Sequence, residues 1–447
     1  MQNTQKDVSS NWWTHTLPWL IAALFLSLGS FFLFNFSKAN ADDLSQLTTS
    51  GQNIEKNGNT FKIQGVNFGG LFETERYMNN TPFVDWKTMV DNNQNDATTW
   101  ENNFWNQDST NGDLANIKNL NANTVRLPFT YMNLIDYSKY QNNQNTKDLN
   151  DIWPDGGDNT AFAQLDNFIK KANDQGLYVV LDLHGAFGSQ NGADHSGQEL
   201  KDSNGNQYQN LYGNNTNQDL TKQLWQKIAN HYKNWTGIAG YDLLNEPNSQ
   251  NGSNSTTGSD QWGYYDQLLN TIRDTGDNHI AFIESVWYPE DLPDPSTYGT
   301  GTNDGRHWDA NNVVYEYHKY PYNSTSSESS AMDWMKGQLN EIQQKNYDVP
   351  TYMGEFNIWD DNNDISNSDW NDFLSTMNSD NFSWTVWNYK SKADSGSNDH
   401  WGAYNEDEQH VSEGDTGYAE WSEFGSPQNL RKNDTVADAI SDNSTPN

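Results

Sequence analysis

Short apolar, β-branched runs alternate with helical stretches along the chain after residue 42. This order predicts βα units and a parallel sheet. Eight runs are present, which is the number that a closed (β/α)8 barrel, the TIM-barrel fold, requires. They occupy residues 61–67, 123–129, 177–184, 237–245, 279–285, 312–318, 350–356 and 383–389.

Two of the intervening stretches show clear helical periodicity. In residues 161–175 and in residues 331–345, apolar side chains recur every three or four positions, so each helix should bury one face. Gly176 follows the first stretch and is placed to adopt the left-handed conformation that ends a helix. The buried faces should consist of Phe162, Leu165, Phe168, Ile169 and Ala172, and of Met332, Met335, Leu339 and Ile342.

Long polar loops follow the predicted strands. A compact domain rarely carries so much loop unless the loops build something. Because each loop follows the C-terminal end of a strand, we expect them to wall one cleft on that face of the barrel. The loops cover approximately residues 72–112, 185–216, 248–261, 286–310, 357–368 and 391–417.

The N-terminal segment differs from the rest of the chain. Residues 17–36 form one apolar run, and Ala39-Asn40-Ala41 then fits cleavage by signal peptidase. The run is also about as long as a membrane-spanning helix, and Lys6 is the only basic residue before it. We therefore predict a signal peptide or membrane anchor over 1–41, with secretion favoured, and a protein that works outside the cytoplasm.

The remaining chain is predicted to contain one folded domain. The (β/α)8 domain should cover residues 42–425, and residues 426–447 should form a polar tail that frays. We expect a monomer, with membrane association only through the N-terminal segment.

Composition narrows the class of ligand. Aromatic residues make up 13% of the chain, with 19 Trp and 22 Tyr, and their flat rings suit the apolar faces of sugars. The formal net charge of −35 would repel a phosphate backbone, so nucleic acid is excluded as a partner.

The chain has no cysteine, and the acidic run 360–364 lacks the glycine and closing glutamate of a calcium loop. We expect no metal and no cofactor.

Two glutamates carry the chemistry that the pattern predicts. Glu246 closes the fourth predicted strand in Asn-Glu-Pro, and Glu355 closes the seventh in Gly-Glu-Phe. In a closed barrel these strand ends face one another across the mouth. Two carboxyl groups on opposite sides of a cleft are the smallest set of catalytic groups that glycoside hydrolases commonly use.

Other polar and aromatic residues stand at neighbouring strand ends. A guanidinium at Arg126 beside Glu355 would keep that carboxylate ionised and orient it as a nucleophile. The remaining residues could bind sugar or support the glutamates, although each could also be an ordinary structural side chain. They are His184, His318, Tyr320 and Trp387.

Together with Asn245-Glu246-Pro247, these residues resemble the active-site set of the family 5 glycoside hydrolases, the cellulase family, in chain order over most of 61–390. Segments 65–75 and 182–197 further resemble the exo-β-1,3-glucanases of yeasts and related bacterial enzymes. Leu71 and Phe187 depart from that branch, which usually has Trp and Pro there.

The resemblance implies a retaining mechanism. Glu355 would be the nucleophile and Glu246 the acid/base, while Asn245 and His184 would hold sugar hydroxyls. Arg126 and Tyr320 would lower the pKa of Glu355, and an apolar wall would raise the pKa of Glu246.

The resemblance favours an exo-β-1,3-glucanase acting on β-glucan. An endo-β-1,4-glucanase and a β-glucosidase for small glucosides are the alternatives among hydrolases. A transglycosylase that remodels glucan shares the same first steps, and a glucan-binding cell-surface protein is the alternative from another class.

Overall fold

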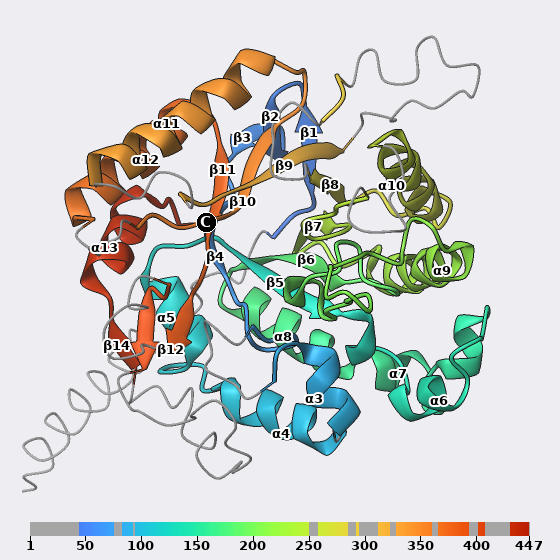
Figure 1. Cartoon of the computed structure of the whole chain (residues 1–447). Coiled ribbons are helices and arrows are strands. Elements are labelled where there is room, and N and C mark those ends of the chain that lie inside the picture. The colour runs from blue at the N-terminus through green and yellow to red at the C-terminus, as the bar shows by residue number, and fades with distance from the viewer. Residues whose placement is uncertain are drawn as a thin grey trace, which may run out of the picture. The chain divides into compact units, whose positions relative to one another are not determined.

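The computed structural model describes residues 44–75, 83–92, 94–249, 258–284, 292–294, 312–321, 328–359, 365–392, 401–406 and 430–446. Eight parallel strands close into a barrel in the order β10-β11-β4-β5-β6-β7-β8-β9, which confirms the predicted fold (Figure 1). The strands are β4 (Gln64–Asn67), β5 (Thr124–Thr130), β6 (Tyr178–Gly185), β7 (Ile238–Asp242), β8 (Ile280–Glu284), β9 (Val313–Lys319), β10 (Thr351–Phe356) and β11 (Ser383–Val386).

All eight predicted strands are present, and one predicted run is divided. Residues 61–67 contain the end of β3 (Asn59–Phe61) and the whole of β4. The short strands β1 (Leu47–Ser50) and β2 (Asn53–Lys56) pair with β3 in an antiparallel sheet that the sequence reading did not include. Leu47 and Ile54 pack with residues from the starts of the barrel strands, such as Tyr178 and Ile280. This small sheet therefore closes the end of the barrel opposite the strand C-termini.

Helices connect the strands, as the alternating pattern predicted. They include α3 (Trp86–Asn92), α4 (Gln94–Phe104), α5 (Asp113–Asn119), α6 (Tyr137–Asn142), α7 (Asp158–Ala161), α8 (Ala163–Asp174), α9 (Asn215–Tyr232), α10 (Gly258–Arg273), α11 (Glu328–Lys345) and α12 (Asn367–Ser379). Both helices predicted from periodicity are confirmed as α8 and α11, and the apolar residues named for each are buried.

Gly176 ends α8 as predicted. Its φ is +74°, and its backbone N–H donates to the carbonyl of Asn173 at 2.9 Å. The N–H of Leu177 donates to the carbonyl of Ala172, also at 2.9 Å, which completes a Schellman motif.

The C-terminal segment corrects the expectation of a fraying tail. The strand β14 (Leu430–Lys432) pairs with β13 (Tyr404–Glu406), which pairs with β12 (Lys390–Lys392), and α13 (Asp434–Asn443) packs beside α12 (Figure 1). Val436 and Ile440, one helical turn apart, are buried. The overall composition is polar, but four buried apolar side chains on one face give this short helix enough apolar surface to dock.

The segment predicted to be a signal peptide or membrane anchor lies outside the described residues. Within the described part of the chain, no helix combines the length and apolarity needed to cross a membrane. Of the six long loops, 185–216 is described throughout and the others only in part.

Candidate active site

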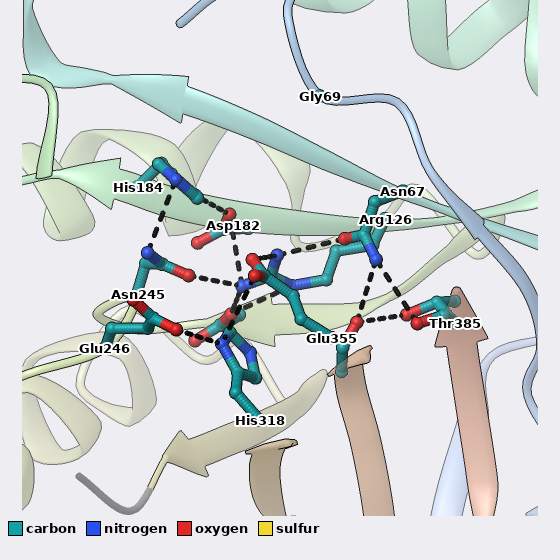
Figure 2. A network of polar contacts seen from close by, with 12 residues as sticks. Asn67, Gly69, Arg126, Asp182, His184, Asn245, Glu246, His318, Glu355 and Thr385 are labelled. Atoms are coloured by element: carbon teal, nitrogen blue, oxygen red, sulfur yellow. Dashed lines mark hydrogen bonds and ion pairs between the residues drawn. The ribbon is translucent and has the colours of Figure 1, made fainter. Parts of the chain in front are cut away.

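The structure brings the eight predicted site residues to one end of the barrel. They come from six strands or from the residues just after them: two residues belong to β7, two to β9 and one to each of the other four strands. Arg126 lies in β5, His184 in β6, Asn245 and Glu246 after β7, His318 in β9, Tyr320 after it, Glu355 in β10 and Trp387 after β11. Figure 2 shows six of these side chains pointing toward one another: Arg126, His184, Asn245, Glu246, His318 and Glu355.

The two glutamates lie close together, with a histidine between them. One carboxylate oxygen of Glu246, one ring nitrogen of His318 and one carboxylate oxygen of Glu355 are all within 4.8 Å of one another. His318 Nδ1 is 3.0 Å from Glu246 Oε1 and 3.4 Å from Glu355 Oε2. The two acidic groups therefore converge on one small volume.

Glu355 is held by a cation and a phenol. Arg126 Nη1 donates to Glu355 Oε1 at 2.6 Å, and the Tyr320 hydroxyl donates to Glu355 Oε2 at 2.9 Å. Both carboxylate oxygens are thus engaged, which fixes the orientation of the group. This arrangement was predicted for Arg126 and Tyr320.

A glycine allows β10 to present Glu355. The pairing register between β9 and β10 shifts between Met353 and Glu355, so Gly354 lies in a bulge. A methyl group on Gly354 would lie 1.6 Å from Glu316 Oε1. Glu316 is fully buried and cannot swing into solvent.

We expect Gly354→Ala to displace the Glu316 carboxylate and, through Arg126, the Glu355 carboxylate. Misplacement of a reacting group by about 1 Å can cost about 100-fold in rate, so kcat/KM should fall by roughly 10- to 100-fold. Gly337→Ala is the matched control, because a methyl group on that residue of α11 meets nothing within 4 Å. Initial rates and thermal unfolding of both variants check the expectation. Unchanged kcat/KM in Gly354→Ala would contradict it.

The segment that carries Glu246 is clamped by its neighbours. The φ of Glu246 is +42°, a conformation that side chains other than glycine rarely adopt. Its N–H donates to Glu284 Oε2, and Asn191 Nδ2 donates to its carbonyl at 3.0 Å. Gln190 Nε2 donates to the carbonyl of Asn245 at 2.8 Å. These contacts stabilise the unusual backbone and aim the carboxyl group at the cleft.

Arg126 lies at the centre of a buried acidic network that the sequence reading missed. Its guanidinium is fully buried and contacts carboxylates of three residues besides Glu355. The distances are 2.6 Å to Asp242, 3.2 Å to Asp182 and 3.4 Å to Glu316. It also donates to Asn245 Oδ1 at 2.9 Å and to Asn67 Oδ1 at 3.0 Å.

A signal for these carboxylates is present in the sequence. Asp182 precedes His184 by two residues in β6, and Glu316 precedes His318 by two residues in β9. Alternate residues of a strand face the same side, so each carboxylate must share the barrel interior with its histidine. A charged residue inside an apolar strand is rarely buried without a partner, and that pattern could have identified the set.

His184 and Trp387 form one wall of the site. His184 Nδ1 is 2.8 Å from Asp182 Oδ2, and its Nε2 is 3.3 Å from Asn245 Nδ2. The imidazole stacks on the Trp387 ring with a centroid separation of 5.6 Å. Burial opposes the charge of His184, but Asp182, Glu75 and Glu73 outweigh it and raise its pKa well above the ordinary value.

Aromatic side chains continue this wall. Tyr320, Trp387 and Trp401 are buried together, and the partly exposed Trp359 packs against them. The ring centroids of Trp359 and Trp401 are 4.9 Å apart. Such a surface beside two carboxyl groups suits the apolar face of a sugar ring.

The directions predicted for the pKa shifts of the two glutamates are reversed in the structure. Burial and the neighbouring Glu246 raise the pKa of Glu355 to about 8, despite Arg126. Burial also acts to raise the pKa of Glu246, but His195, His318 and His184 outweigh it and lower the pKa to about 2. The prediction was wrong for two physical reasons: burial raises the pKa of Glu355 more than Arg126 lowers it, and imidazoles rather than apolar groups contact Glu246.

Three groups of described histidines and carboxylates have the spacing of metal ligands. They are Glu73, Glu75 and His184; Asp182, His184 and Glu355; and Glu246, His318 and Glu355. Their members already contact one another or Arg126, whose positive charge next to the second group disfavours a cation. The expectation of no metal and no cofactor stays a prediction.

Comparison with known proteins gives a family match. The family model Cellulase (glycosyl hydrolase family 5) matches residues 78–393, well over half of the chain.

A beta-xylosidase of Phanerodontia chrysosporium is 26% identical over 378 residues, covering 78% of this chain and 71% of that protein. A probable glucan 1,3-beta-glucosidase A of Neosartorya fischeri is 28% identical over 255 residues, covering 54% of this chain and 55% of that protein. The match thus spans about half the length of the glucosidase. Among solved structures, rutinosidase from Aspergillus niger matches with a TM-score of 0.56 at 15% identity, over 77% of this chain and 95% of that one, which supports the barrel fold.

Proposed function

The chain belongs to glycosyl hydrolase family 5, the cellulase family, and is a glycoside hydrolase; we propose that it cleaves β-glucans with retention of configuration. The observation that carries this proposal is the convergence of Glu246 and Glu355 within 4.8 Å around His318. Retaining glycosidases hold their carboxyl groups about 5–5.5 Å apart, whereas inverting enzymes need about 6.5–9.5 Å to seat a water.

In the first step, a carboxylate oxygen of Glu355 attacks the anomeric carbon, and the bond to the leaving oxygen breaks as Glu246 protonates that oxygen. In the second step, Glu246 takes a proton from water, whose oxygen attacks the anomeric carbon and releases Glu355. Arg126 and Tyr320 orient the nucleophile, while His184 and Asn245 are placed to bind sugar hydroxyls.

The first step requires that Glu246 be protonated and that Glu355 be ionised. Burial and Glu246 raise the pKa of Glu355, and imidazoles lower the pKa of Glu246. His318 Nδ1 lies within 3.4 Å of both carboxylates, so it is placed to pass a proton between them.

We propose exo-β-1,3-glucanase activity as the specific reaction. The name of the Neosartorya relative and the resemblance of segments 65–75 and 182–197 support it. The test below also distinguishes three alternative activities: endo-β-1,4-glucanase, β-glucosidase on small glucosides and transglycosylase. The beta-xylosidase among the relatives makes a xyloside a necessary comparison.

We expect glucose to be the only early product from laminarin. Pustulan, carboxymethylcellulose, p-nitrophenyl β-glucoside and p-nitrophenyl β-xyloside should be hydrolysed more slowly at equal concentration. Chromatography of the products during the first few per cent of conversion measures this. A ladder of oligosaccharides contradicts exo action. Products longer than the substrate at high substrate concentration indicate transglycosylation. Hydrolysis of the xyloside at a higher rate than laminarin contradicts the assignment to β-glucan.

We propose that the protein works outside the cytoplasm as a monomer. The apolar run 17–36 and the small residues before Asp42 support export. A mature protein that begins near Asp42 indicates cleavage, and retention of the full mass in the membrane fraction indicates an anchor.

A further inference from the structure

Two imidazoles, rather than one, contact the carboxyl group of Glu246. His318 Nδ1 lies 3.0 Å from Oε1, and His195 Nε2 lies 3.1 Å from Oε2. His318 comes from a barrel strand and was predicted from the sequence. His195 lies in the 3-10 helix η3 (Asp194–Ser196) of the loop after β6, and neither strand position nor the family resemblance pointed to it.

The loop that carries His195 is held by buried polar contacts. The hydroxyls of Ser189 and Ser196 contact each other, and both residues are buried. Asn191 Oδ1 accepts from the N–H of Ala193 at 2.8 Å. The geometry therefore fixes the position of η3 in the loop.

The same loop is joined to the Glu246 segment. Asn191 Nδ2 donates to the carbonyl of Glu246 at 3.0 Å, and Asn245 Nδ2 donates to the carbonyl of His195 at 3.1 Å. The two segments thus form one unit, and the contact between the imidazole and the carboxyl group is a built feature of the site.

The imidazole of His195 lies between two carboxylates. Its Nδ1 is 3.4 Å from Asp194 Oδ1, on the side opposite to Glu246. Burial opposes its charge, but Glu246, Asp194 and Glu75 outweigh it and raise the pKa of His195 to about 9. The side chain is 26% exposed, whereas that of Glu246 is 7% exposed, so His195 also lies between the acid and solvent.

We propose that His195, held as an imidazolium by Asp194, is a positioning residue that sets the charge of Glu246 and fixes the pH above which the enzyme loses its catalytic proton. This inference rests on the proposed role of Glu246 as acid/base. A cation in contact with a carboxyl group favours the carboxylate. His195 therefore favours the basic form that Glu246 uses in the second step, and it makes the acidic form that the first step needs available only at lower pH.

Other charged groups face Glu246 and His195 from the surrounding strands and also influence the charges of these two residues. Glu246 is also approached by His318 on β9, by His184 on β6, by Glu284 on β8 and by Glu355 on β10. On the other side, Glu75 lies after β4 and acts on His195. Among the charged groups of the described residues around this pair, only His195 combines direct contact with Glu246, a carboxylate partner of its own and partial exposure.

The test is the pH profile of kcat/KM for p-nitrophenyl β-glucoside. Its alkaline limb reports loss of the acid proton in the free enzyme. His195→Gln keeps a hydrogen-bond donor but removes the charge, so the pKa of the glutamate pair should rise. The alkaline limb should then move to higher pH by about 1 to 3 units, the shift that an opposite charge at contact distance produces. His195→Lys keeps the charge and should leave the limb near its wild-type position.

A second imidazole–carboxylate pair provides the matched control. His231 Nε2 lies 2.9 Å from Asp166 Oδ1 on α9 and α8, away from the site. His231→Gln should leave the alkaline limb unchanged. A limb that stays in place in His195→Gln, or that moves equally in His195→Lys, overturns the proposal.

Failure of this inference can be separated from failure of the proposed function. Glu246→Ala must first lose most activity on the p-nitrophenyl substrate while keeping much more on a dinitrophenyl glucoside, whose leaving group needs no acid. If Glu246→Ala lacks that pattern, the proposed function fails. If Glu246→Ala shows it and His195→Gln has an unshifted limb, only the role of His195 fails.

Discussion

Glu355→Gly should lose activity by roughly 10⁴-fold or more, the scale seen when a catalytic nucleophile is removed. Without the carboxylate, no covalent intermediate can form, and Arg126 and Tyr320 lose the group that they orient. The smaller side chain also leaves space beside Arg126. Added azide should enter that space, attack the anomeric carbon directly and yield the glycosyl azide with inverted configuration. Initial rates and nuclear magnetic resonance of the azide product measure both effects.

Glu355→Gln tests the charge without opening space. It should lose activity on the same scale and should not be rescued by azide. Glu341→Gln, an exposed position on α11, is the matched control and should keep wild-type rates. Retained activity in both Glu355 variants, or an azide product of retained configuration from Glu355→Gly, would contradict the role of Glu355 as nucleophile.

Glu246→Ala should lose activity by about 10²- to 10⁴-fold on substrates whose leaving group must be protonated, which is the usual contribution of a general acid. On a dinitrophenyl glucoside the first step should stay fast, because that leaving group departs without a proton. The second step should be slow, because no base activates water. An initial burst of dinitrophenol, followed by a slow steady state, is the expected time course.

Azide again separates the two roles. In Glu246→Ala it should attack the glycosyl-enzyme intermediate from the side that Glu246 vacates and give the glycosyl azide with retained configuration. Because Glu246 has a positive φ, Glu246→Asn, which tolerates that conformation, distinguishes backbone effects from loss of the acid. Equal losses on activated and unactivated substrates would contradict the acid/base role.

The sequence predicted the barrel because its signal is local and repeated. Each strand is a short run buried on both faces, and each helix that was assigned has one apolar face, as in α8. The C-terminal helix α13 was missed because its sequence is polar overall. Its few apolar side chains stabilise the helix only by packing against α12, which the sequence does not show. The small β1–β3 sheet was missed because strands of three or four residues carry little periodicity.

The sequence was enough to predict which residues gather at the candidate site, but not which of their charged groups are in contact. Strand-end positions were enough to name Glu246, Glu355 and Arg126. They did not show that Asp182, Asp242 and Glu316 share the same guanidinium. Arg126 lowers the pKa of Glu355, but burial and the neighbouring Glu246 outweigh it and raise that pKa overall.

The amino-acid sequence by itself determined the fold and was enough to predict eight residues for the candidate site, because strand and helix periods and the residues that end each strand are properties of neighbouring positions. Only the tertiary structure decided which groups are in contact, and therefore in which direction their pKa values shift. Glu246 follows His195 by 51 positions in the chain, yet His195 Nε2 and Glu246 Oε2 lie 3.1 Å apart once the barrel closes. The energy of a charge depends on burial and on distances of a few ångströms, and closure of the barrel sets both.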